Sequence, residues 1–395
     1  MNTISQTISV AVMNLRSLPQ RLGSSLVIVI GSGGVVAVLV AVLAMSTGMS
    51  KTLQSVGRDD RAIGLRNGSA SESSSALSRD AARLIMDAPG IKRDKDGKPI
   101  ASAEPIQLLK LFKRDDGSEV TVPLRGVGSR AFDLRPEVKL VQGRKFRPSV
   151  NEVIVGAAAK SQYKNLEIGS TITTRTATWT IVGIFSSDGD AHESELMADA
   201  DTVLSSNSDS DYGSVTVLLD SPTALQEFSD SLATNPALRV DVTRKRDYYA
   251  RQSKTVSGLL SVLIYVVGSI MAVGAILGAL NTMYSAVSTR AREIATLRAL
   301  GFKSSAMVIS VLVESLLLAT LGGMVGALIA WLFFNGHTIS TTQGSSQSQL
   351  IFEIAVTPTL AIIGIAISAA IGFVGGLLPA VRAARLPIAT ALREV

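Results

Sequence analysis

The stretch Ser288–Lys303, STRAREIATLRALGFK, decides the fold, because it stands between two long apolar segments. Neither Val256–Ala286 before it nor Ser305–Phe334 after it contains Lys or Arg, and Leu26–Met45 and Val356–Pro379 are similar. About 20 apolar helical residues are enough to cross a bilayer core. We therefore predict a membrane protein with four transmembrane α-helices, at residues 26–46, 256–286, 305–334 and 356–380.

The composition agrees with membrane insertion. Hydrophobic residues make up 47% of the 395 residues, and the mean hydropathy is +0.34. The net charge is +6, but residues 47–255 carry 29 Lys and Arg against 28 Asp and Glu. The basic excess therefore lies beside the apolar segments, which indicates membrane topology and argues against a nucleic-acid partner. The chain has no cysteine, so disulfides and thiolate metal sites are excluded.

Basic residues near the spans predict the orientation, because Lys and Arg resist translocation. Residues 1–25, 287–304 and 381–395 are basic and belong in the cytoplasm, with both termini, whereas residues 47–255 and the loop 335–355 lie outside. The first span then acts as a retained signal anchor in the cytoplasmic (inner) membrane. The residues that carry this signal are Arg16, Arg21, Arg290, Arg292, Arg298, Lys303, Arg382, Arg385 and Arg393.

Residues 47–255 form a large extracytoplasmic domain between the first and second spans, and their patterns predict an α+β fold. Ser78 is placed to cap a helix that ends before Pro89, and Leu108–Phe112 and Val120–Leu124 flank a turn, which predicts a hairpin. We expect two subdomains, divided by the polar segment 186–211. Further predicted elements are strands at Val153–Val155, Thr171–Thr176 and Thr178–Phe185 and a strand-helix-strand unit formed by Val215–Leu219, Ser221–Asn235 and Val240–Thr243.

Three spans carry glycine pairs at a spacing of four, which allows helix backbones to approach closely. We expect these pairs to pack the helices into a bundle. Because four helices make a small bundle, a homodimer or a paired homologous permease is expected. The pairs are Gly274 with Gly278, Gly322 with Gly326, and Gly372 with Gly376.

No catalytic or nucleotide-binding site is predicted. Gly301-Phe302-Lys303-Ser304 resembles the end of a phosphate-binding loop, but Phe302 occupies the position where that loop needs glycine. A cluster of Asp188, Asp190, His192, Glu193 and Glu195 offers carboxylates to a divalent cation, but its spacing favours a solvated loop.

Glu314 lies about ten residues inside the third span. A carboxylate in hydrocarbon is costly unless it is paired, protonated or near water. Two interpretations stay open: a functional group in a conformational lock or substrate path, or a structural clamp with a nearby arginine.

The stretch Ser288–Lys303 itself predicts a short amphipathic helix that Gly301 ends. Ile294, Leu297 and Leu300 fall on one face, and Arg290, Arg292 and Arg298 lie around it. Such a helix lies on the lipid surface or fills a groove on a partner protein, and the pattern alone favours neither.

The residues Arg290–Phe302, RAREIATLRALGF, resemble the coupling-helix motif of the MacB/FtsX-like ABC permeases. Glu314, the glycine-rich Leu321–Gly326 and the ending Pro379–Pro387 agree with this family, and Asn151–Phe185 is similar to its extracytoplasmic core domain. Asn14–Arg21 is similar to its amphipathic N-terminal helix.

The resemblance implies a permease subunit that binds no cofactor and works as a dimer with two copies of a separate ABC ATPase, which binds ATP and Mg²⁺. Each ATPase would grip residues Arg290, Arg292, Glu293, Ile294, Leu297, Arg298, Leu300, Gly301 and Phe302. Only 25 residues precede the first span, so we expect no fused ATPase.

The leading hypothesis is a non-catalytic permease that moves its outside domain to export or extract a lipoprotein, lipid, peptide or amphiphilic drug, with a periplasmic adaptor as a further partner. The alternatives are an FtsX-like regulator that activates a cell-wall hydrolase, and a membrane sensor or scaffold without a motor. Neighbouring genes for an ATPase, an adaptor or a hydrolase would separate them.

The topology is testable because the chain has no native cysteine. Single cysteines at Ser74, Ser205 and Ser346 should react with a membrane-impermeant maleimide in intact cells, whereas one at Ser304 should react only after permeabilisation. Labelling at Ser304 but at none of the other positions would contradict the orientation.

Overall fold

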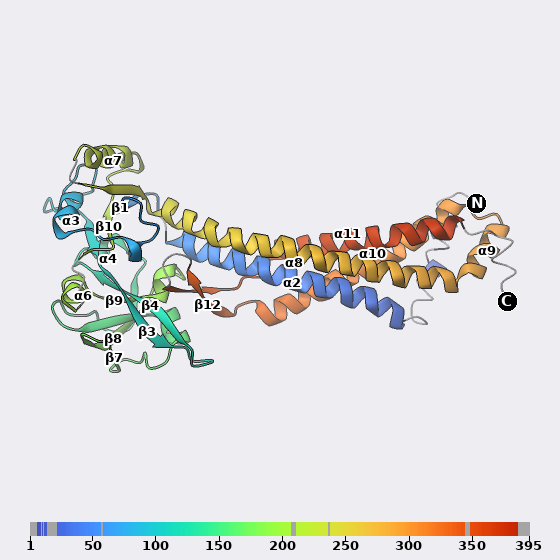
Figure 1. Cartoon of the computed structure of the whole chain (residues 1–395), viewed down its shortest axis with the longest axis horizontal. Coiled ribbons are helices and arrows are strands. Elements are labelled where there is room, and N and C mark those ends of the chain that lie inside the picture. The colour runs from blue at the N-terminus through green and yellow to red at the C-terminus, as the bar shows by residue number, and fades with distance from the viewer. Residues whose placement is uncertain are drawn as a thin grey trace. The chain divides into compact units, whose positions relative to one another are not determined.

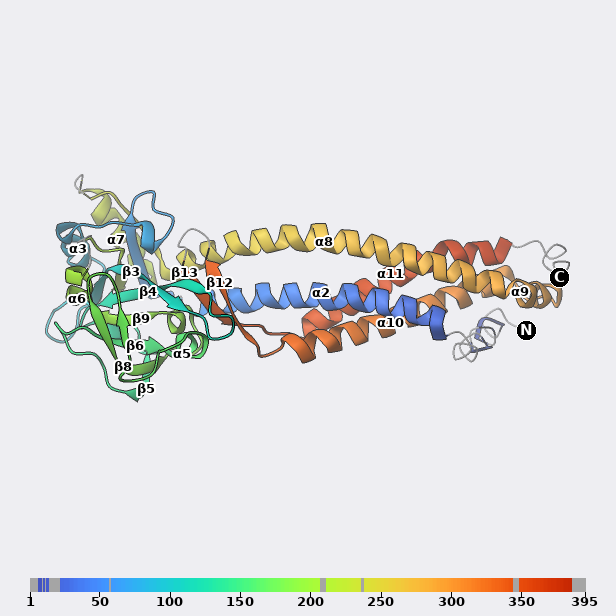
Figure 2. The ribbon, with the colours of Figure 1, turned by 60° about the horizontal axis from the view of Figure 1, so that its bottom comes forward.

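The computed structural model describes residues 6–8, 10, 12–13, 22–56, 58–206, 211–235, 238–343 and 348–385. The Asn14–Arg21 motif, Ser346 and Arg393 lie outside these residues. The chain divides into a helical unit, made of Met1–Thr47, Leu259–His337 and Ile354–Val395, and a sheet unit, made of Gly48–Gly258 and Thr338–Glu353. Figures 1 and 2 show the helices and strands of the two units.

Four described helices are long and apolar enough to cross a membrane, which confirms the prediction of four spans. The helix α8 begins at Lys245, eleven residues before the predicted start of the second span, so its first turns belong to the sheet unit. The short helix α9 lies between α8 and α10. The bounds are α2 Leu22–Ser55, α8 Lys245–Thr289, α9 Ala291–Ala299, α10 Ser304–Phe334 and α11 Pro358–Arg385.

Glycine packs the helices of the helical unit closely at two of the three predicted pairs. A Cβ on Gly322 or Gly326 would collide with α2, at Ser32 and at the carbonyl oxygen of Gly33 respectively. Gly372 and Gly376 lie against Ala319 and Ser315 of α10, so α10 and α11 also approach through small residues.

The third pair differs from the prediction. A Cβ on Gly274 or Gly278 would meet no described atom within 4 Å, so this pair packs no helix of the described chain. The physical reason is that α8 turns this face away from the other described helices, and Val273 and Leu277 beside it are 55% and 60% exposed.

The first sheet of the sheet unit is antiparallel, with strand order β11-β1-β10-β2. Helix α3 lies against it, and the Ser78 hydroxyl accepts a hydrogen bond from Ala81 N at 3.2 Å, as expected of a cap. Ile85 and Phe228 are buried in its core with Val215 and Val217. The elements are β1 Arg61–Arg66, η2 Glu72–Ser74, α3 Arg79–Met86, β2 Ala101–Glu104, β10 Ser214–Leu218, η4 Pro222–Ala224, α7 Leu225–Ala233 and β11 Val240–Arg244.

The second sheet is mixed, with strand order β3-β4-β9-β6-β8-β5 and β7 paired to β8. The predicted hairpin is present as β3 and β4, and Gly117 in its turn has φ +70°, a conformation that glycine adopts readily. Trp179 and Tyr163 are fully buried in its core. The elements are β3 Ile106–Phe112, β4 Glu119–Val127, α4 Ala131–Leu134, β5 Lys139–Gly143, β6 Glu152–Gly156, α5 Ala157–Gln162, β7 Thr171–Thr173, β8 Thr178–Ser186, η3 Ala191–Ser194, β9 Leu196–Asp199 and α6 Ala200–Ser206.

The predicted subdomain boundary at 186–211 includes one of two crossings between the sheets, but its first part belongs to the second sheet. The chain crosses between the sheets near Pro105 and again after Ser206, so the second sheet is an insertion within the first. The segment 187–206 is part of that insertion, because β9 lies between β4 and β6 with Leu196, Met197 and Ala198 buried. Polar composition misled the prediction for the first part of this segment, since Asp190, His192, Ser194 and Glu195 are buried, although Asp188 is exposed.

The link between the third and fourth spans is a β-hairpin where a polar loop was expected. The strands β12 Thr338–Gln343 and β13 Ser348–Glu353 pair in antiparallel register, and Leu350, Ile351 and Phe352 are buried. The hairpin belongs to the sheet unit, so both segments predicted to lie outside fold together.

The glycine contacts give a stability prediction with a matched control. The substitution Gly326→Ala should lower the heat-inactivation midpoint of the detergent-solubilised chain, because overpacking costs about 1–3 kcal/mol. The control Gly278→Ala adds the same methyl group where there is space and should leave the midpoint unchanged or slightly higher. Size-exclusion chromatography after heating measures both, and equal midpoints for Gly326→Ala and wild type would contradict the packing.

Candidate functional site

One face of helix α9 packs against other residues of the helical unit. Ile294 and Ala295 are 7% and 1% exposed, and Ile294 packs in a cluster with Val10, Met307 and Val311. Leu297 and Phe302 pack against the same cluster. The opposite face is exposed and carries Arg292, Glu293, Thr296, Ala299 and Leu300.

The predicted partner-contacting residues divide between the two faces of α9. Ile294 and Arg290 face the interior of the helical unit, and Leu297 is half-buried there, so they do not form the outer face of α9. Leu300, by contrast with these three residues, is 73% exposed. Gly301 ends the helix with φ +90°, as its place in the motif predicted.

Arg290 and Glu314 form a buried ion pair. Arg290 Nη1 lies 3.2 Å from Glu314 Oε2, and each side chain is 6% exposed. Arg290 is the residue that precedes α9, and Glu314 lies in α10. Of the two interpretations that the sequence left open for Glu314, this contact supports the clamp, because it joins the start of α9 to the third span.

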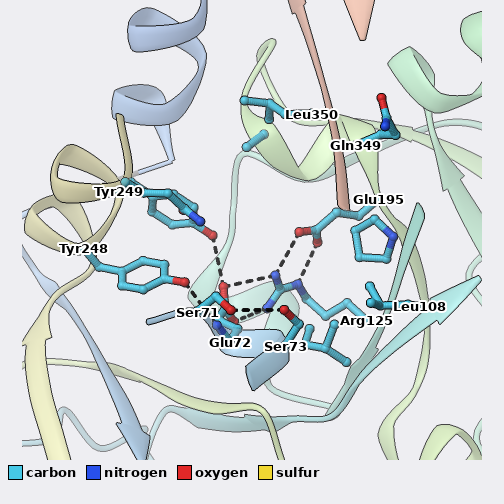
Figure 3. A pocket seen from close by; sticks show the side chains of 14 residues that line it. Ser71, Glu72, Ser73, Leu108, Arg125, Glu195, Tyr248, Tyr249, Gln349 and Leu350 are labelled. Atoms are coloured by element: carbon cyan, nitrogen blue, oxygen red, sulfur yellow. Dashed lines mark hydrogen bonds and ion pairs between the residues drawn. The ribbon is translucent and has the colours of Figure 1, made fainter. Parts of the chain in front are cut away.

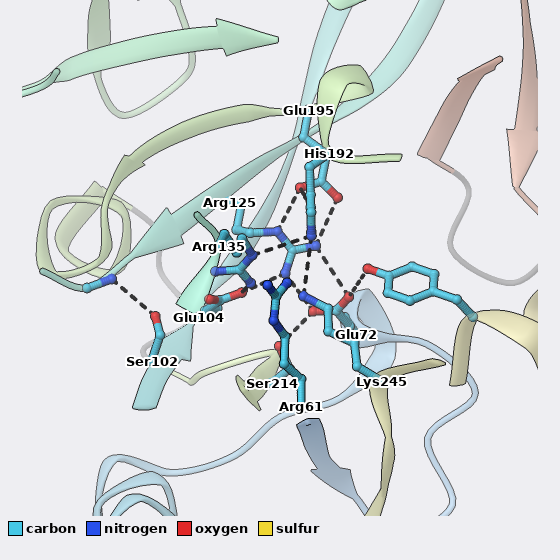
Figure 4. A network of polar contacts seen from close by, with 12 residues as sticks. Arg61, Glu72, Ser102, Glu104, Arg125, Arg135, His192, Glu195, Ser214 and Lys245 are labelled. Atoms are coloured by element: carbon cyan, nitrogen blue, oxygen red, sulfur yellow. Dashed lines mark hydrogen bonds and ion pairs between the residues drawn. The ribbon is translucent and has the colours of Figure 1, made fainter. Parts of the chain in front are cut away.

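A second cluster of buried charges lies in the sheet unit, with Arg125 of β4 at its centre (Figure 4). The Arg125 guanidinium contacts three carboxylates: Glu195 through Nε at 2.7 Å, Glu72 through Nη1 at 2.6 Å and Glu104 through Nη1 at 2.9 Å. Arg135 Nη2 also donates to Glu104 at 2.7 Å. Because Glu104 ends β2 and Arg125 lies in β4, the cluster joins the two sheets.

The first residues of α8 enter the same cluster. Lys245 is fully buried, and its Nζ lies 3.3 Å from His192 Nε2. His192 Nδ1 lies 3.1 Å from a Glu195 oxygen. The Tyr249 hydroxyl donates to Glu72 at 3.3 Å, so α8 contacts both the η2 turn and the η3 turn.

The charges shift the pKa values of these groups strongly. Burial alone would raise the pKa of Glu104, but the positive charges of Arg135, Arg125 and Lys245 outweigh it and lower that pKa to about 2. Burial lowers the pKa of Lys245 to about 7, and the nearby Arg135 acts in the same direction. Burial and then Lys245 also lower the pKa of His192. The lowered pKa favours the neutral imidazole, with Nδ1–H directed at Glu195 and Nε2 accepting from Lys245 and from Arg135 Nε at 3.4 Å.

A pocket opens beside this cluster (Figure 3). Arg125, Glu72 and Glu195 line its floor, and Tyr248 and Tyr249 line one side. Gln349 and Leu350 of the hairpin lie on the pocket wall as well. The pocket thus brings together α8, the second sheet and the link between the third and fourth spans.

The structure overturns the prediction of a solvated loop for three of the five residues of the acidic cluster, whereas Asp188 is exposed as expected. Asp190 and His192 are 2% and 0% exposed, and Glu195 is 8% exposed and paired with Arg125. Among the described residues no group of His, Asp and Glu side chains is arranged to hold a metal ion. The spacing of the cluster was visible in the sequence, but its cationic partners Arg125 and Lys245 were not.

Two family models match the chain. The MacB-like periplasmic core domain matches residues 22–235, and the FtsX-like permease C-terminal region matches residues 265–388. The fold and the helix between the second and third spans define a multi-pass ABC transporter permease with a large domain between its first two spans. The chain belongs to the MacB/FtsX-like permease family.

Individual relatives agree with this assignment. A "Macrolide export ATP-binding/permease protein MacB" of Neisseria meningitidis serogroup A is 25% identical over 311 residues, which are 75% of this chain and 47% of that protein. A protein of the same name from Shewanella sp. strain W3-18-1 is 29% identical over 153 residues, 38% of this chain and 22% of that protein. The chain spans about half the length of the Neisseria relative.

Two solved domains are also similar. The periplasmic region of MacB from Actinobacillus actinomycetemcomitans has a TM-score of 0.36 at 17% identity and covers 51% of this chain and 92% of its own. The extracellular domain of the noncanonic ABC-type transporter YknZ from Gram-positive bacteria has a TM-score of 0.34 at 15% identity and covers 46% and 99%.

The Arg125 cluster predicts a stability loss in acid. The pKa of Glu104 is about 2 in the folded chain, against an ordinary value of 4.5, so its contribution to stability is present above pH 4.5 and disappears as the pH falls toward 2. This contribution is about 3 kcal/mol. In Glu104→Gln the free energy of unfolding should be lower at pH 7 and should fall less between pH 4.5 and 2.

Urea unfolding of the full chain in detergent, followed by the fluorescence of buried Trp179, measures this effect. The substitution Trp331→Phe removes the other tryptophan, and Glu227→Gln on the exposed face of α7 is the matched control. A Glu104→Gln chain with the acid dependence of the control would contradict the prediction.

Proposed function

We propose that this chain is the permease subunit of an ABC transporter, which couples ATP hydrolysis on a separate ATPase to movement of its extracytoplasmic domain. The observation that carries the proposal is α9, which joins the second and third spans, buries one face in its own chain and leaves the other exposed. A helix that is both anchored and exposed transmits force from a partner protein to the helices on either side of it.

The proposed complex contains two copies of the ATPase, which bind ATP and Mg²⁺, and two permease chains, as a homodimer or with a homologous permease. Both termini lie in the cytoplasm. The transported class is a lipoprotein, lipid, peptide or amphiphilic drug. The name of the curated relatives, macrolide export proteins, supports an amphiphilic drug within that class.

The exposed face of α9 supports a contact with a protein partner. Leu300 is an exposed apolar side chain at the end of the helix, and Arg292 and Glu293 are exposed polar groups at its start. An exposed apolar side chain beside exposed charged groups offers a protein partner both an apolar contact and polar contacts around it. The pair of Arg290 with Glu314 stabilises the start of α9, so the face keeps its orientation relative to α10.

The proposal predicts that Leu300→Asp releases the ATPase. Loss of an interface anchor costs about 1–2 kcal/mol or more, so the affinity for the ATPase should fall about tenfold or more. Co-purification of the ATPase with the tagged chain, in detergent and in nanodiscs, measures the loss. The control Leu84→Asp places the same change at an exposed leucine of α3 in the sheet unit and should leave binding intact.

The substitution Ile294→Asp separates the two faces of α9. It should lower the thermal stability of the chain itself, because Ile294 is buried in the helical unit, whereas Leu300→Asp should not. A helix that lies on lipid would give another result: the ATPase would stay bound to Leu300→Asp, and function would follow the arginines and the anionic lipid content. That result would contradict the coupling role of α9.

A further inference from the structure

The six residues Asp190–Glu195, which we call the 190–195 turn, form a hydrogen-bonded turn in the sheet unit. The Asp190 carboxylate accepts from His192 N at 2.8 Å and caps the η3 turn. The Glu193 carboxylate accepts from Ser187 N at 2.6 Å and from the Ser186 hydroxyl at 2.7 Å. The start of the turn and the residues that precede it are therefore held by side chains of the turn itself.

The backbone of the turn is fixed to the second sheet. Gly156 N donates to Glu195 O at 3.0 Å. A Cβ on Gly156 would collide with the carbonyl oxygen of Glu193, so the two backbones approach as closely as glycine permits. Any displacement of the turn therefore displaces β6 as well.

Two side chains of the turn connect it to the start of α8. His192 contacts Lys245, the first residue of the helix, at 3.3 Å. Glu195 holds Arg125 through two hydrogen bonds of 2.7 and 2.9 Å, and Arg125 holds Glu72, which accepts from Tyr249 of α8. These groups are all buried, so the contacts are not weakened by solvent.

A third side chain connects the turn to the hairpin between the third and fourth spans. Ile351 N donates to Ser194 Oγ at 2.9 Å, and Ser194 Oγ lies 3.3 Å from Ile351 O. Ser194 is 1% exposed, and Ile351 is buried in the core of the second sheet. A single serine therefore satisfies both backbone groups of one residue in β13.

We propose that the 190–195 turn is the joint that makes the start of α8 and the β12–β13 hairpin move together, with His192 and Ser194 as its positioning residues. The inference rests on the proposed function, because it states where movements of the second span and of the link between the third and fourth spans meet. Lys245, Glu104, Glu72, Arg125 and Arg135 surround the His192 side of the joint.

Two cysteines in the cysteine-free full chain test the joint. Spin labels at Lys254 of α8 and Ser340 of β12, in nanodiscs without nucleotide, should give one narrow distance distribution. The substitution Ser194→Ala should broaden it, because the hairpin loses two hydrogen bonds. The matched control Ser205→Ala removes a hydroxyl that donates, within the described chain, to Thr202 O of its own helix and should change nothing.

Variants of His192 test the other side of the joint. His192→Leu should also broaden the distribution, and His192→Gln should restore it, because a carboxamide donates to Glu195 and accepts from Lys245 as the neutral imidazole does. Fluorescence of buried Trp179 reports whether each variant is folded. A wild-type-like distribution in folded Ser194→Ala and His192→Leu would overturn the joint.

The complex with the ATPase supplies a readout that a merely structural role would not change. In wild type the distance between Lys254 and Ser340 should stay constant between the nucleotide-free and ATP-trapped states. In Ser194→Ala it should become dependent on nucleotide while basal ATP turnover is unchanged. A wild-type distance that itself changes with ATP would overturn the joint. Failure of wild type to bind the ATPase would instead contradict the proposed function, and the nucleotide-free measurement would still decide the joint.

Discussion

The guanidinium of Arg125 is the group on which the sheet unit depends. A buried charge is stable only when it is paired and hydrogen-bonded, and this one needs Glu72, Glu104 and Glu195 from three separate segments of the chain. The segments that carry these three carboxylates, at β2, η2 and η3, must therefore lie next to Arg125 in β4. Removal of one partner would leave an uncompensated buried charge, which is strongly destabilising, so all three carboxylates are needed at once.

The sequence predicted those parts of the fold that local pattern determines. Long apolar segments indicated the spans, alternation and the turn at Gly117 indicated the β3–β4 hairpin, and Ser78 indicated the start of α3. It failed for residues 187–206, because the burial of a polar side chain depends on distant partners. Glu195 meets Arg125 across 70 residues, and His192 meets Lys245 across 53.

The α9 motif shows the same limit on a smaller scale. The spacing of Ile294, Leu297 and Leu300 predicted an amphipathic helix, but periodicity does not say whether the chain itself or a partner covers the apolar face. The structure divides that face: Ile294 is buried in the helical unit, and Leu300 is exposed. The ion pair of Arg290 with Glu314 explains the division, since it fixes the rotation of the helix about its own axis.

A buried cationic side chain lies at each end of α8, and these two side chains hold the ends of the helix in place. Lys245 begins the helix, and Arg290 directly follows its last residue, Thr289; they are 0% and 5% exposed. Between them Tyr265 and Ile270 are 76% and 67% exposed in the described chain. A helix held at both ends resists stretching because its backbone hydrogen bonds are internal. The second half of α8 also packs within the helical unit, where Ala279, Met283 and Val287 are buried. Under the proposed function, an input at Arg290 would reach Lys245 along this one continuous helix, which is what a transmitting element requires.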